Sequence, residues 1–125
     1  MDKRSIFYII GSLFGLTGIA LGAFGAHSLK AQISAEMLSV FETGVRYQMY
    51  HAFALIVAAW FLDVRQNRRF EVAAWLFVAG VVLFSGSLYV LAISGITSIG
   101  IVTPLGGLAF LGGWLSLVLG FLKKE

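Results

Sequence analysis

Residues 72–122 read VAAWLFVAGVVLFSGSLYVLAISGITSIGIVTPLGGLAFLGGWLSLVLGFL, a stretch of 51 residues without a charged side chain. A helix needs about 20 apolar residues to cross the roughly 30 Å of hydrocarbon in a bilayer, so this stretch is long enough for two crossings. Its middle, residues 94–100, reads SGITSIG, and glycine mixed with hydroxyl residues is typical of a tight turn. The stretch therefore predicts two membrane spans, at about residues 71–93 and 103–122.

The start of the last span is indicated by Pro104. Proline is tolerated in the first turn of a helix, because the N–H that it lacks has no intrahelical partner there. Thr103 is the expected N-cap, since its hydroxyl can accept from a free backbone N–H. The helix should therefore begin at residue 103 or 104.

Two further spans precede this stretch. Residues 5–26 form a run of 22 uncharged residues, which is too long for the apolar core of a signal peptide and predicts a retained anchor. Residues 47–62 form a run of only 16. The preceding segment, SAEMLSVFETGVR at 34–46, is amphipathic at helical spacing, with Ser34 as a plausible N-cap. The second span is therefore expected over 35–62, beginning with this amphipathic part.

The composition agrees with a membrane protein. Hydrophobic residues make up 59% of the chain and charged residues 12%, about half the fraction typical of soluble domains, and the mean hydropathy is +0.92. The chain has no cysteine, which excludes disulfides and thiol chemistry, and its basic residues form no polar face that would favour nucleic acid. We expect an all-α, four-transmembrane-helix bundle, with residues 1–125 as a single integral membrane domain.

The orientation follows from the basic residues. With four spans, both termini and the loop at 63–71 share one side of the membrane, which then holds seven of the nine lysines and arginines. We expect the protein in the plasma (inner) membrane of the cell. The positive-inside rule places the side that holds these basic residues, and so both termini, in the cytoplasm. The seven residues are Lys3, Arg4, Arg65, Arg68, Arg69, Lys123 and Lys124.

Small residues recur along the first and last spans at the spacing of one helix face. Helices in lipid associate through close backbone approach, which small residues permit, and an average spacing of 3.5 favours nearly parallel packing. We expect a tight bundle in which these two spans pack closely against each other; a hinge or a surface for another protein is the alternative use. The two stripes are Gly11, Gly15, Gly18, Gly22 and Gly25, and Gly106, Ala109, Gly113, Ser116 and Gly120.

Polar side chains gather in the first loop and around FETGVRYQMYHA, residues 41–52. Glu42 and Arg46 are four residues apart on a helix and can form an ion pair, worth about 0.3–0.5 kcal/mol at a surface. Tyrosines are common at a membrane boundary. We interpret the set as an interfacial hydrogen-bonded cluster that ties the first loop to the second helix. Its members are His27, Lys30, Glu42, Arg46, Gln48, Tyr50 and His51.

Four blocks of sequence together resemble a known family. They are GAFGAHSLK at 22–30, FETGVRYQMYHA at 41–52, LFSGSLY at 83–89 and TPLGGLAFLGGW at 103–114. In order and spacing they resemble the small bacterial inner-membrane family typified by YgdD and YwdK, which has relatives among small eukaryotic transmembrane proteins. Ser28 departs from that pattern, which has glycine there. The resemblance implies a multi-pass membrane protein of unknown function, with no catalytic or binding residue to transfer.

Three functions are compatible with these patterns. The first is a non-enzymatic accessory or assembly partner that binds another membrane protein or further copies of itself, with no catalytic residue, metal or cofactor. The second is an oligomeric transporter or channel that carries protons, ions or small molecules along Glu42, Arg46 and His51. The third is a haem-, quinone- or lipid-binding redox subunit or enzyme that uses His27 and His51; however, no metal-site or nucleophile motif accompanies them.

Overall fold

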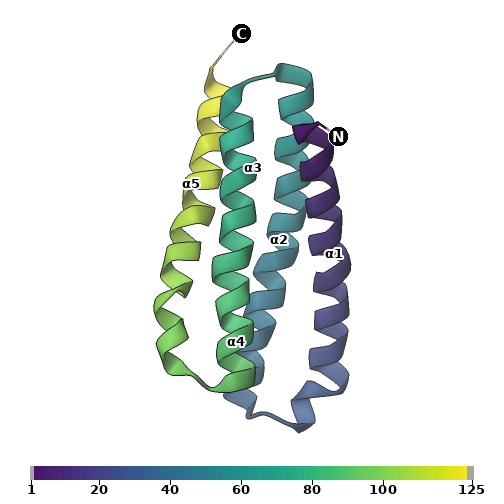
Figure 1. The fold of residues 1–125 in the computed structure, drawn as a ribbon, viewed down its shortest axis with the longest axis vertical. Helices are drawn as coiled ribbons and strands as arrows, with labels where there is room; N and C mark the ends of the chain where they lie inside the picture. Colours follow the sequence, from purple (N-terminus) through teal and green to yellow (C-terminus); the bar gives the residue numbers. More distant parts are fainter. Residues whose placement is uncertain (1, 124–125) are drawn as a thin grey trace.

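The computed structural model describes residues 2–123, and all regular structure in that range is helical. The described chain forms four helical rods that run alternately up and down (Figure 1). The third rod is a continuous unit of two α-helices joined by a π-helical segment, and short 3₁₀ helices, Leu29–Ala31 and Thr97–Ile101, lie in two connections. The rods are α1 (Lys3–His27), α2 (Ala35–Arg65), α3 (Arg68–Gly80) with η2 (Val81–Ser85) and α4 (Gly86–Ser94), and α5 (Thr103–Leu122).

Three of these rods are long and apolar enough to cross a membrane: Lys3–Ala31, Arg68–Ser94 and Thr97–Leu122. The remaining rod, α2, has 31 residues and is therefore about 46 Å long, more than a bilayer core requires. It is less apolar because it carries Glu36, Glu42, Arg46, Asp63 and Arg65. It is also the central helix, in contact with α1, α3 and α4. Small buried side chains, Ala52, Ala54, Ala58 and Ala59, line its inner faces.

The helix ends mostly agree with the sequence predictions. Ser34 caps α2 by accepting from the backbone N–H of Met37 over 3.1 Å. Asp2 caps α1 in the same way, since its carboxylate accepts from the backbone N–H of Ser5. This hydrogen bond holds the pKa of the Asp2 carboxyl below its ordinary value. The start of α5 at Thr103 is confirmed, but its N-cap is Val102. Thr103 was expected as the cap; its hydroxyl instead hydrogen-bonds the hydroxyl of Ser87 on α4.

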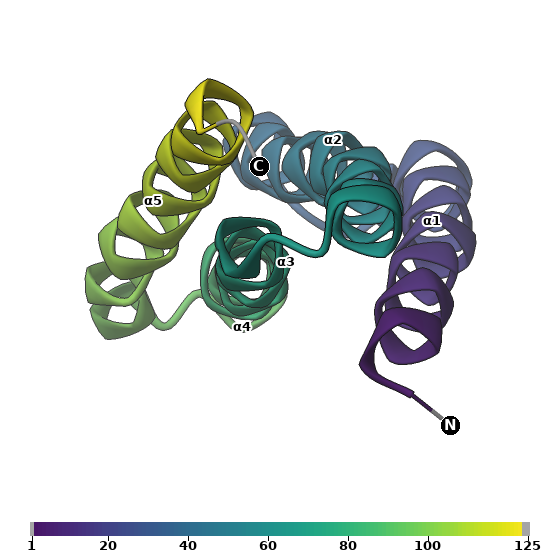
Figure 2. The same cartoon turned by 90° about the horizontal axis from the view of Figure 1, so that it is seen from above.

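The rods pack in a different order from the one expected. α1 packs mainly on α2, and α5 packs mainly on α3 and η2. Figure 2 shows α1 and α5 on opposite sides of the α2 and α3 pair. The expectation that the first and last spans pack closely against each other is therefore wrong. The stripe of α1 packs against larger side chains of α2, and the stripe of α5 packs against larger side chains of the third rod. The two stripes therefore do not need to meet.

The stripe on α1 faces α2. A Cβ on Gly11 would lie 2.8 Å from Ile56, and one on Gly25 would lie 2.9 Å from the ring of Phe41. A Cβ on Gly18 would likewise meet the side chain of Met49. A Cβ on Gly22 would lie 3.4 Å from the side chain of Val45, which is an ordinary van der Waals distance. Gly15 has nothing within 4 Å. Three of the five glycines, Gly11, Gly18 and Gly25, thus make the close approach that the stripe predicts.

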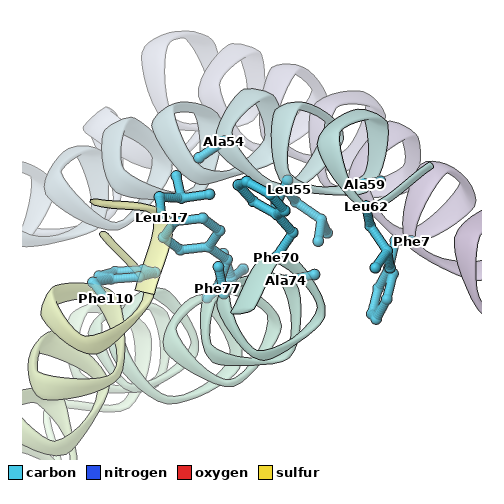
Figure 3. Packing of buried hydrophobic residues seen from close by; sticks show 13 residues of the cluster. Phe7, Ala54, Leu55, Ala59, Leu62, Phe70, Ala74, Phe77, Phe110 and Leu117 are labelled. Carbon is cyan, nitrogen blue, oxygen red and sulfur yellow. The ribbon is translucent and has the colours of Figure 1, made fainter. Parts of the chain in front are cut away.

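The stripe on α5 interlocks with phenylalanines of the third rod. Phe70, Phe77 and Phe84 follow one another at intervals of seven, and they lie against Gly120, Gly113 and Gly106 respectively. The arrangement is reciprocated once, since Phe110 of α5 lies against Gly80 of α3. Figure 3 shows Phe70, Phe77 and Phe110 in the core beside Leu117. We refer to the three Phe–Gly contacts as the Phe/Gly ladder.

The ends of α1 and α5 that bear the chain termini lie at the same end of the bundle, which we call the terminal end (Figure 1). There Lys3 pairs with Glu71 of α3 over 3.0 Å, and Arg4 pairs with Asp63 of α2 over 3.3 Å. Tyr8 also donates to Asp63 over 3.0 Å. These contacts join α1 to the other rods at this end.

Candidate functional site

His51 is buried in the middle of α2, with 4% of its surface exposed. Its Nδ1 lies 2.7 Å from the backbone carbonyl oxygen of Tyr47, and the indole Nε1–H of Trp114 donates to its Nε2 over 3.0 Å. A carbonyl can only accept and an indole N–H can only donate. The imidazole is therefore neutral, with its proton on Nδ1 and both ring nitrogens engaged.

Aromatic rings surround this imidazole. Phe110 of α5 stacks on it with ring centroids 3.6 Å apart and planes inclined by 9°. Phe77 of α3 lies 5.4 Å away and also makes an edge contact with Trp114 at 5.3 Å. Pairs of aromatic side chains contribute about 0.5–1.5 kcal/mol beyond their buried area. His51 thus sits where α2, α3 and α5 meet.

A groove of about 600 Å³ opens beside His51 between α2 and α5. Its lining is almost wholly apolar, and its volume lies in the range of about 300–1,000 Å³ typical of binding pockets. The Tyr47 hydroxyl has no hydrogen-bond partner within residues 2–123. We call this feature the α2/α5 groove; its lining residues are Tyr47, His51, Phe84, Pro104, Gly107, Leu108, Phe110, Leu111 and Trp114.

Gln48 lies three residues before His51 on the buried face of α2, and its side chain joins α2 to α1 and α4. Its Nε2 donates to the carbonyl oxygen of Phe14 over 2.9 Å and to the hydroxyl of Thr17 over 2.8 Å, both on α1. Its Oε1 accepts from the hydroxyl of Tyr89 on α4 over 2.6 Å. The side chain is 4% exposed, so its polar atoms are satisfied by protein groups inside the bundle.

We expect Gln48→Leu and Tyr89→Phe each to lower the free energy of unfolding by about 0.6 kcal/mol and at most by about 1.7 kcal/mol, the average and the maximum measured for hydrogen bonds between helices in a membrane. The double variant should lose less than the sum, because both changes remove the same bond. SDS titration in mixed micelles measures all three values. Tyr50→Phe is the control, since this exposed tyrosine makes no side-chain hydrogen bond in the described chain. Strict additivity would contradict the role given to Gln48.

The other candidate residues do not converge on His51. His27, Lys30, Glu42, Arg46 and Tyr50 are all exposed. The ion pair expected between Glu42 and Arg46 is absent from residues 2–123, where the pairs are those of Lys3 and Arg4. Tyr50 makes an edge contact with the ring of Tyr47 at 5.5 Å. The predicted cluster therefore divides into two buried side chains and five that face outward.

His27 and His51 are held far apart. Gly18 of α1 lies level with Met49 of α2. His27 is nine positions beyond Gly18 (27 − 18), or about 13 Å further along the helix. His51 faces α5 instead of α1. The two imidazoles do not form a joint site, and no group of three or more metal-ligating side chains occurs within residues 2–123.

The aromatic partners of His51 were not predicted from the sequence, although a signal for its burial exists. Residues on the buried face of α2 recur at alternating intervals of three and four positions, which is the period of one packed helix face. Glu42 and Arg46 fall outside this series, whereas both buried candidates belong to it. Its members are Phe41, Gly44, Gln48, His51, Leu55, Ala58 and Leu62.

The comparison with known proteins agrees with the four sequence blocks. A model of the family described as "Protein of unknown function (DUF423)" matches residues 21–107, more than two thirds of the chain. The chain belongs to this family. The UPF0382 membrane protein YwdK of Bacillus subtilis is 44% identical over 119 residues, which cover 94% of this chain and 97% of that protein. A UPF0382 membrane protein of Haemophilus influenzae is 42% identical over 116 residues, covering 91% of each chain.

These relatives confirm the resemblance and identify a membrane protein of a bacterial family without an assigned function. No solved structure matches the chain. The roles of the α2/α5 groove and of Gln48 therefore rest on the geometry described above.

Proposed function

We propose that this protein is a non-enzymatic accessory subunit that binds a transmembrane helix of another membrane protein in the α2/α5 groove. The observation that carries the proposal is the groove itself, which is apolar and already formed in the single chain. Its polar pair, His51 and Trp114, is satisfied internally, so a partner does not have to supply a hydrogen bond to either. Preformed surfaces lose less entropy on binding.

Two features favour a helix as the occupant. Gly107 lies on the groove wall, and a Cβ there would meet only the ring of Phe84, at 4.0 Å, so a partner backbone can approach closely. The α5 side of the groove extends from Pro104 to Trp114, about 15 Å along the helix axis, which is the length of about three turns. Trp114 and Tyr47 belong to the residue types that dominate protein interfaces.

The proposal includes four membrane crossings with both termini in the cytoplasm. The length of α2 permits the fourth crossing, and its apolar part carries no charge between Arg46 and Asp63. The terminal end of the bundle bears most of the basic side chains, in line with the positive-inside rule. The opposite half of the bundle bears Lys30, in the first loop, and Arg46, on α2.

The competing functions have less support. A pathway along Glu42, Arg46 and His51 would need these groups in one channel, but the first two are exposed and His51 lies on another face of α2. Ligation of haem or metal by His51 would require it to give up the hydrogen bond from Trp114 or to transfer its Nδ1 proton. An accessory role needs neither change.

The test is photocrosslinking in cells that express the protein at its native level. A benzophenone amino acid replaces Leu111 in the groove or, as the control, Ile19 on the outer face of α1. Both side chains are 67% exposed, so lipid contact is matched. We expect a discrete adduct with another membrane protein from position 111 and none from position 19.

The adduct should disappear when Gly107→Leu fills the groove. Lipid adducts alone at position 111, or equal protein adducts at both positions, would overturn the proposal. An adduct of twice the chain's own mass would replace the foreign partner with a second copy of this protein.

A further inference from the structure

The terminal end carries a second cleft, of about 320 Å³, that is independent of the α2/α5 groove. It lies where α3 begins and α5 ends, and both of these rods are long and apolar enough to cross a membrane. Its lining residues are Asn67, Arg68, Arg69, Val72 and Lys123. The cleft is therefore placed at the boundary between the membrane and water.

Three cations of this cleft have no acidic partner within residues 2–123. The two carboxylates nearest in sequence to Arg68 and Arg69 are Asp63 and Glu71, and both are paired with residues of α1. Arg68, Arg69 and Lys123 are exposed and form no ion pair there. Three positive charges that lack an acidic partner in the described part of the chain attract an anion at a membrane surface.

The backbone that carries these cations is fixed from both sides. Arg65, which does not line the cleft, donates to the carbonyl oxygen of Lys123 over 2.9 Å and lies over the ring of Phe70 at 5.8 Å. Ser116 of α5 donates to the carbonyl oxygen of Arg69 over 2.7 Å. The end of α5 is thus held against the start of α3, so the cleft is formed before any ligand arrives.

We infer that this cleft binds the phosphodiester head group of an anionic phospholipid. The arginines present planar groups that match a phosphate, and Lys123 adds a third charge. Val72 lies one turn further along α3 and is an exposed apolar side chain on the cleft wall. A lipid can place its phosphate among the cations and its acyl chain along this apolar side, whereas free phosphate uses only the cations.

Native mass spectrometry of the full chain in detergent tests this inference. The probes are phosphatidylglycerol and phosphatidylcholine with identical acyl chains, and inorganic phosphate. Wild type should retain phosphatidylglycerol in preference to phosphatidylcholine. The double variant Arg68→Gln/Arg69→Gln should weaken phosphatidylglycerol binding about thirtyfold, since each basic side chain near an anionic surface contributes about fivefold.

The control is Lys30→Gln/Arg46→Gln, which removes the same charge from the other half of the bundle. It should retain phosphatidylglycerol like wild type. Equal losses in both double variants, or no loss in either, would overturn the site. The lipid would be overturned as the ligand by two results together. Inorganic phosphate at millimolar concentration would bind with the same dependence on Arg68 and Arg69, and the protein would show no preference for phosphatidylglycerol. All variants change exposed side chains, and circular dichroism verifies that they are folded.

Discussion

Gly106→Ala is expected to lower the free energy of unfolding by about 1–3 kcal/mol, the usual cost of forcing extra atoms into a packed core. A Cβ at this position would overlap the backbone nitrogen and Cα of Phe84, so the obstacle is main chain and cannot rotate away. α5 would have to move off η2. The loss should appear despite the gain in helix propensity of about 1 kcal/mol that alanine brings.

The adjacent glycine supplies the matched control. Gly107→Ala makes the same chemical change in the same helix, but its new Cβ would have only a ring atom of Phe84 at 4.0 Å. It should be neutral or stabilising by up to about 1 kcal/mol. SDS titration of both variants in mixed micelles gives the comparison. Equal effects at the two positions would mean that α5 does not pack on the third rod as described.

His51→Ala is expected to cost about 3–5 kcal/mol, as for the removal of other buried rings. The change leaves a cavity against Phe110 and deprives the Trp114 N–H of its acceptor. His51→Phe separates the two causes, because it keeps a ring for Phe110 but still leaves the indole N–H unpaired. That variant should lose about 1–3 kcal/mol, the cost of a donor left without a partner away from water, because the indole lines the apolar groove.

The second histidine of the chain is the control for this prediction. His27 is exposed at the end of α1, so His27→Ala should change the free energy of unfolding by no more than about 0.5 kcal/mol. A large loss from His27→Ala, with little from His51→Ala, would place the important imidazole in the first loop instead of the bundle.

Local sequence signals predicted the rods well. Ser34 before an amphipathic segment indicated the start of α2, and Pro104 indicated the start of α5. These signals act within one or two turns, so a single segment contains them. The glycines of the two stripes were also correctly expected to make close contacts, with the exceptions of Gly15 and Gly22.

The sequence did not predict in the same way which helix packs against each glycine stripe. A stripe of glycines indicates a face that accepts a bulky neighbour, but it does not identify that neighbour. The partner of the α5 stripe is encoded in Phe70, Phe77 and Phe84, which match it only when the two helices run in opposite directions. For the candidate site, proximity in sequence grouped Glu42 and Arg46 with His51, whereas helical phase separates them by face.

The Phe/Gly ladder has a consequence for how the third rod and α5 find their alignment. Two of its contacts, Phe70 with Gly120 and Phe77 with Gly113, place a ring against a glycine. A slide of α5 by seven residues, about 10 Å, would still place Phe70 against Gly113 and Phe77 against Gly106. Hydrophobic contact alone would discriminate weakly between these two alignments. Two hydrogen bonds exist only in the observed one, from Ser116 to the carbonyl of Arg69 and between Ser87 and Thr103. These hydroxyl groups therefore select one register between two helices whose apolar contacts repeat every seven residues.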